Sequence, residues 1–220
     1  MDSLEEASIS LDLFFNQRLQ VYNKLKNELD NCKKNDEQLY CDTLLIFLYA
    51  QLEGFVNDVL LYYLEVINYK KIKKKDAIPE ICASSSCNYF DSYDEYIKNK
   101  NLSKYTGRVK FIKEIDNILN SEIKLPIHLI NTENNLKQKV LEDLMVKLGF
   151  DKSRYSKIGN MLDNFVNLRN AIAHGNNSRS KLTIKIYETY ESIVIYNIMQ
   201  NLKDLVFESI EKELYLIPRT

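Results

Sequence analysis

The chain has little of the two residues that most often interrupt helices and form tight turns. Only 5 glycines and 3 prolines occur among its 220 residues. Because many short strands need many turns, this scarcity argues against a β-rich fold and favours long helices with short connections. No G-x-x-x-x-G-K sequence occurs either. The chain therefore lacks the phosphate-binding loop that many nucleotide hydrolases use, and no cofactor is expected.

An excess of charge of one sign is also missing. The 30 basic and 31 acidic residues leave a net charge of -1. Proteins that coat nucleic acids present a broad positive field, which this composition excludes. Any contact with RNA must therefore be local.

Cysteine patterns that would indicate a metal site are absent. The chain has four cysteines, at positions Cys32, Cys41, Cys82 and Cys87. They form no C-x2-C pair, and neither histidine lies near them in the sequence, which argues against zinc. We expect free thiols in a reducing compartment and no metal.

Signals for export or membrane insertion are also lacking. The first six residues are acidic and resemble no signal peptide. The longest apolar stretch, residues 44–67, is interrupted by Glu53, Asp58 and Glu65. Because charged side chains are costly inside a bilayer, we expect no membrane span and a cytoplasmic protein.

What the chain does have is apolar residues at helical spacing, which make up part of its 45% hydrophobic content. They predict an all-α, up-and-down bundle of long helices in a single domain over residues 1–220. A partly irregular insertion with one short helix is expected at about residues 76–103. The predicted helices cover residues 3–31, 38–69, 104–120, 134–148, 154–173 and 180–214.

Two segments allow both a structural and an RNA-binding interpretation. The lysine-rich run from Lys70 to Lys75 is typical of a solvated helix end, because cations suit a helix C-terminus. It could also contact a phosphate backbone. In the insertion, aromatic residues such as Tyr89 and Phe90 could stack on bases, although packing onto the bundle is the favoured interpretation.

Arg169 lies in the middle of an apolar helical stripe. At about 100° per residue, Leu162, Phe165 and Ile172 fall close to one line along the helix, and Arg169 falls within about 20° of it. A buried, unpaired guanidinium is very costly. Arg169 must therefore meet a carboxylate, a phosphate or a crevice between subunits.

His174 follows Arg169 by five residues, which places it about 140° around a regular helix. The two side chains converge only if the helix breaks near Gly175, or if His174 acts with the Arg169 of another subunit. Such a pair suits phosphodiester chemistry, because histidine transfers protons near neutral pH and arginine stabilises charge on phosphate oxygens. The structural alternative is that these residues only form a capped helix end. The other histidine, His128, lies between apolar residues and is expected to have a structural role.

Residues 168–175 resemble the R-polar-x3-H signature of the HEPN superfamily, which contains all-helical RNases and RNA-binding domains. Residues 48–56, LYAQLEGFV, resemble the second-helix segment of its MAE-like branch. Residues 135–141 and 148–150 resemble the mid-chain helix of that branch, and residues 162–166 match the approach to the motif. The resemblance covers most of residues 1–215 and is weakest near residues 76–103.

The resemblance implies a homodimer whose two motifs face each other across a cleft and cleave RNA without a metal. Such proteins often act as toxins or in defence against phage, held in check by an antitoxin or another partner protein. By the same resemblance, Arg169 and His174 are catalytic, while Asn170 and Glu53 support them. The sequence departs from one HEPN pattern at Asn176, where toxins with a nucleotidyltransferase antitoxin have a tyrosine. Silencing by nucleotide transfer onto that position is therefore not expected.

Two other interpretations remain open from the sequence. In the first, the same groove belongs to a non-catalytic module that binds RNA or a protein. In the second, the bundle is purely structural and Arg169 forms an ion pair with Glu53.

Overall fold

The structure is a computed structural model that describes residues 4–91, 104–176 and 181–218. Within these ranges it contains helices and no strand, and two isolated β-bridges join Lys73 to Glu122 and Ala77 to Leu216. The predicted all-α class is confirmed.

The α-helices are α1 (Leu4–Glu28), α2 (Asp30–Asn35), α3 (Glu37–Tyr69), α4 (Pro79–Ser84), α6 (Lys104–Asn120), α7 (Gln138–Lys147), α8 (Gly159–Ala173), α9 (Ile184–Ser192) and α10 (Asn201–Glu211). The π-helix η4 (Ile193–Gln200) joins α9 to α10 without a break. Short 3-10 turns complete the described chain: η1 (Lys74–Asp76), η2 (Ile127–Leu129) and η3 (Lys152–Ile158).

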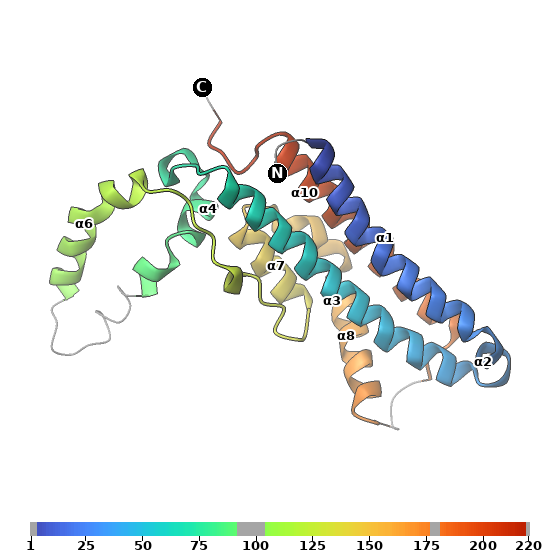
Figure 1. The fold of residues 1–220 in the computed structure, drawn as a ribbon. Helices are drawn as coiled ribbons and strands as arrows, with labels where there is room; N and C mark the ends of the chain where they lie inside the picture. Colours follow the sequence, from blue (N-terminus) through green and yellow to red (C-terminus); the bar gives the residue numbers. More distant parts are fainter. Residues whose placement is uncertain (1–3, 92–103, 177–180, 219–220) are drawn as a thin grey trace.

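Helix α3 is the centre of the bundle. It contacts α1, α8, α9, η4 and α10, and α1 runs along its length (Figure 1). Its apolar residues lie on nearly all sides, and seventeen of its side chains are buried. Asp36 caps its first turn, because the Asp36 carboxylate accepts a hydrogen bond from the Leu39 backbone N–H at 3.0 Å.

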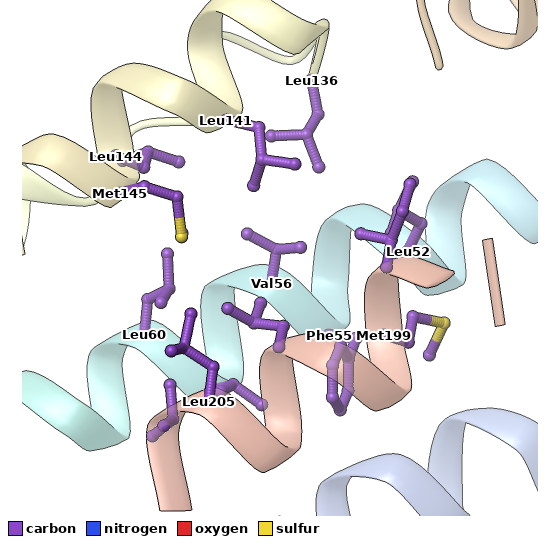
Figure 2. Packing of buried hydrophobic residues seen from close by; sticks show 14 of the residues in the cluster. Leu52, Phe55, Val56, Leu60, Leu136, Leu141, Leu144, Met145, Met199 and Leu205 are labelled. Atoms are coloured by element: carbon purple, nitrogen blue, oxygen red, sulfur yellow. The ribbon is translucent and has the colours of Figure 1, made fainter. Parts of the chain in front are cut away.

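Helix α7 and the C-terminal helical segment cover two sides of α3. Figure 2 shows Leu52, Val56 and Leu60 of α3 between these layers. Buried side chains of this kind each contribute about 1.5–3 kcal/mol when they are removed from water. The residues that meet them in the figure are Leu136, Leu141, Leu144, Met145, Met199 and Leu205.

Helix α6 has a different environment. It projects from the body of the bundle in Figure 1, contacts the turn η1, and packs its Phe111 ring against Phe90 at a centroid distance of 6.4 Å. Helix α4 falls within the predicted insertion and begins with Pro79 at its first turn. The single-domain organisation with an insertion at about residues 76–103 stays a prediction, and residues 92–103 of that insertion lie outside the described ranges.

Several predicted helix boundaries are wrong for local reasons. The first predicted helix divides at Leu29 into α1 and α2. Helix α7 begins at Gln138 because Glu133 and Asn134 have positive φ angles of 56° and 52°, which no right-handed helix allows. The last helix begins at Ile184, where the Thr183 side chain accepts a hydrogen bond from the Ile186 backbone N–H.

Helix α3 is long and apolar enough to cross a membrane by length and composition alone. More than half of its most apolar window is buried against the rest of the chain, as in the core helix of a bundle. The expected absence of a membrane span therefore stays a prediction.

Four fully buried tyrosines predict a loss of stability at alkaline pH. Burial raises the pKa of the hydroxyls of Tyr63, Tyr155, Tyr187 and Tyr215 above the usual 10.0. The unfolded chain therefore releases these protons first, so the stability that they contribute is complete below pH 10 and is lost as the pH rises through their folded values. Each tyrosine lowers the free energy of unfolding by up to about 1.4 kcal/mol per pH unit in that window.

Urea unfolding between pH 8 and pH 11, with tyrosinate absorbance recorded in parallel, tests this expectation. The stability should fall above pH 10, and these tyrosines should ionise only as the chain unfolds. Ionisation of all 15 tyrosines near pH 10 in a chain that stays folded would contradict it.

Candidate active site

Helix α8 carries the predicted site, and Arg169 lies on its core-facing side. Leu162 and Phe165 of the predicted stripe are buried, and Ile172 packs against the core. Arg169 itself is half-buried. Its guanidinium carbon lies 3.9 Å from the ring centroid of Tyr49, so the charged group stacks on an aromatic face.

Tyr49 forms a fixed platform beneath Arg169. Its side chain is 1% exposed, and its hydroxyl accepts a hydrogen bond from the Leu136 backbone N–H at 2.9 Å. Its ring packs against Phe165 with a centroid distance of 6.2 Å. Burial is the main cause that raises the pKa of Tyr49, and the nearby charge of Glu53 adds to it. Tyr49 therefore stays neutral and in place.

Asn170 holds the other edge of the guanidinium. Its Oδ1 accepts a hydrogen bond from Arg169 Nη1 at 2.7 Å, and its Nδ2 donates to Asn135 Oδ1 at 3.1 Å. Asn135 belongs to the turn before α7. A chain of two amides therefore fixes the orientation of Arg169 without neutralising its charge.

Glu53 lies one turn after Tyr49 on α3, but it forms no ion pair with Arg169 or His174 within the described ranges. Its carboxylate accepts a hydrogen bond from the hydroxyl of the buried Thr132 at 2.8 Å. The structure thus gives Glu53 a different partner from the expected ones. Its role in a reaction stays a prediction.

His174 is the last residue before the helix break. Its backbone N–H still donates to the Asn170 carbonyl at 3.0 Å, and its side chain is exposed. Gly175 has a φ of 65°, and hydrogen bonds from Gly175 to Ile172 and from Asn176 to Ala171 close the end of α8. The expected break is present, but it follows His174. Because α8 is regular through Ala173, His174 lies about 140° around the helix from Arg169.

Residues 14–208 match the RiboL-PSP-HEPN family. The chain belongs to this family of the HEPN superfamily. No curated protein and no solved structure matches the chain. The family supports a nuclease or RNA-related role at the level of the superfamily, whereas the MAE-like branch stays a prediction.

The predicted site residues of this HEPN chain therefore divide into two groups. Arg169 and Asn170 lie together with Tyr49, while His174 is placed on another side of α8. His128 is exposed in η2 and makes no ion pair in the part of the chain that the structure describes. That observation places it at the surface, not in the core.

Two residues of the candidate site, Tyr49 and Asn135, entered the sequence interpretation only as parts of resembling segments. The contact of Tyr49 with Arg169 depends on how α3 and α8 cross, which the spacing of residues does not show. Asn135 belongs to a polar turn, and no spacing links it to Asn170. Tyr49 precedes Glu53 by four residues on α3, so its place on the same helix face was the one signal that could have indicated it.

Tyr49→Phe is expected to lower the free energy of unfolding by about 1–3 kcal/mol, because the buried Leu136 N–H loses its acceptor. The aromatic ring under Arg169 remains. Urea unfolding measures the change, and the exposed Tyr196→Phe provides the matched control with a change near zero. Equal stability of the two variants would contradict the assigned hydrogen bond.

Proposed function

We propose that this HEPN chain is a metal-independent endoribonuclease that acts as a toxin or phage-defence effector. The observation that carries the proposal is the environment of Arg169. Its guanidinium is held by Tyr49 and Asn170, and it meets no carboxylate among the residues that the structure describes. A half-buried cation that forms no ion pair with the described carboxylates can bind an anion, and the bidentate guanidinium suits a phosphate.

The proposed reaction uses the ribose 2′-OH as the nucleophile. The 2′-oxygen attacks the adjacent phosphorus, the bond from phosphorus to the 5′-oxygen breaks, and a 2′,3′-cyclic phosphate remains. His174 accepts the 2′-OH proton or donates a proton to the leaving 5′-oxygen, and water carries out the other proton transfer. Arg169 stabilises the charge on the non-bridging oxygens.

The position of His174 leads to a homodimer as part of the proposal. Within one chain, Arg169 and His174 lie on different sides of α8, so a single regular helix does not present both to one phosphate. Because His174 is exposed, it can reach the Arg169 site of a second copy. In a symmetric dimer the same contact occurs twice. An antitoxin or defence-system partner would then control this enzyme in the cytoplasm.

The same separation favours one alternative, a non-catalytic module that binds RNA or a protein. In that case Arg169 binds a ligand, and His174 only ends the helix.

Incubation of the wild-type protein and His174→Ala with total RNA in EDTA, followed by end mapping, separates the two functions. The proposal predicts wild-type cleavage with 2′,3′-cyclic phosphate and 5′-hydroxyl ends, and loss of cleavage in His174→Ala. Cleavage by His174→Ala at the wild-type rate would overturn it. Tight RNA binding without cleavage by the wild type would support the binding module.

A further inference from the structure

A second cationic surface lies at the other end of α3. Lys71, Lys73 and Lys75 line one side of a groove of about 790 Å³, and the C-terminal segment from Leu216 to Pro218 lines the other. The backbone fixes the two walls to each other, because the Ile217 N–H donates to the Asp76 carbonyl at 3.0 Å. The groove is therefore part of the fold.

The lysines of the run from Lys70 to Lys75 have different environments. Lys70 forms an ion pair with Glu213 at 3.1 Å, and Lys74 is buried at 5% exposure. The other three lysines, Lys71, Lys73 and Lys75, are exposed and have no ion pair within the described ranges. Alternate lysines thus line the groove. A helix end that is only solvated does not require this arrangement.

Acidic groups near the groove do not cancel this charge. Asp76 is the acidic residue in its lining, which leaves three lysines against one carboxylate. Glu122 lies opposite Lys73 in an isolated β-bridge, but the two side chains form no ion pair in the described part of the chain. The groove therefore attracts an anion.

Lys71 occupies a backbone conformation that usually belongs to glycine. Its φ is 49°, directly after the C-cap residue Lys70 of α3. A side chain at such a position is strained, and strained residues persist where their side chains have a use. A lysine therefore occupies a position where glycine would suit the backbone better.

We propose that this groove binds the phosphodiester backbone of RNA, as a second contact for the substrate of the proposed nuclease. The lysines contact phosphates, and the apolar wall from Leu216 to Pro218, where Ile217 is 48% exposed, contacts riboses and base faces. A wall of this kind fits a nucleotide chain better than a free phosphate. The inference rests on the proposed function for its substrate.

The position of the groove sets the length of RNA that can use it. Tyr49 contacts Arg169, and Tyr69 ends α3 just before the lysines. These two residues are 20 positions apart on α3. At ~1.5 Å per residue, the two sites are therefore separated by about 30 Å along this helix (Figure 1). A long RNA reaches both sites, whereas a very short one reaches one.

The experiment measures binding of labelled RNA to the His174→Ala protein, so that cleavage does not interfere. The test variant adds Lys71→Ala, Lys73→Ala and Lys75→Ala. The control instead adds Lys24→Ala, Lys152→Ala and Lys157→Ala, which remove three exposed lysines outside the groove. For RNA of about 20 nucleotides, the test variant should bind about 10- to 100-fold more weakly than the parent. The slope of the logarithm of its affinity against the logarithm of the salt concentration should be shallower by about 2, whereas the control stays close to the parent.

Binding of RNA of about 4 nucleotides separates the groove from the Arg169 site, because such RNA cannot span both. Each site can bind such RNA by itself, so we expect the parent to bind two molecules per chain and the triple variant to bind one, at the Arg169 site. Equal weakening by the test and control variants, or an unchanged affinity for long RNA, would overturn the groove assignment. Lysine-dependent binding to anionic lipid vesicles with unchanged RNA affinity would also overturn it.

Lys71→Gly distinguishes binding from a structural role. It relieves the positive φ, so the unfolding midpoint should stay or rise, while the affinity for long RNA falls. Unchanged RNA affinity would overturn the role of Lys71. These binding results do not depend on cleavage. A wild-type protein that cleaves nothing therefore removes the proposed nuclease, and the RNA affinities still decide the groove.

Discussion

Arg169→Ala is expected to reduce RNA cleavage by about 100- to 1,000-fold, because it removes the guanidinium that stabilises the charge on the phosphate. His174→Ala is expected to reduce it by about 100- to 10,000-fold through the loss of proton transfer. Single-turnover cleavage of a labelled RNA measures both effects on the chemical step.

Matched variants separate these effects from a general loss of charge. Arg154→Ala removes an exposed arginine of η3 and should leave the cleavage rate near that of the wild type. Arg169→Lys keeps the positive charge but loses the planar, bidentate group, so it should recover only part of the activity. Arg169→Ala activity within a few-fold of the wild type would contradict a role for Arg169 in catalysis.

Phe165→Ala is expected to lower the free energy of unfolding by about 3–5 kcal/mol. Phe165 is 1% exposed, and its ring lies between Tyr49 at 6.2 Å and Tyr190 at 5.6 Å. The substitution leaves a cavity beneath the platform of Arg169. Because these rings support the site, RNA affinity should fall together with stability.

The neighbouring Asn164 provides the control for this prediction. Its side chain is exposed on the same helix, so Asn164→Ala should change the stability by less than about 0.5 kcal/mol. Urea unfolding at constant pH measures both variants. A loss of less than 1 kcal/mol in Phe165→Ala would show that the packing around Tyr49 is not as tight as described.

The sequence predicted the helices best where apolar spacing continued over many turns. Helix α3 was predicted within one residue of its start, and α6 at both ends, since local periodicity determines both. The prediction failed where backbone conformation changes without a change in polarity. Examples are the turn at Leu29, the 3-10 segment η3 before α8 and the π-helix η4.

At the site, helical angles predicted the core-facing position of Arg169 and its separation from His174. The partner of Arg169 could not be predicted from spacing. A carboxylate, a phosphate and a subunit crevice were all open, and the structure instead shows Tyr49 and Asn170. Contacts between α3 and α8 depend on the crossing of two helices that are distant in the sequence. A single sequence contains no pattern that predicts how these two helices cross.

The central claim is that Arg169 of one copy and His174 of another act on the same phosphate. The most direct test is RNA cleavage by mixed dimers of Arg169→Ala and His174→Ala, purified through two different tags. Each variant alone should be inactive. The mixed dimer keeps one intact pair of the two, so it should recover about half of the wild-type activity. A mixed dimer as inactive as either parent would contradict the claim.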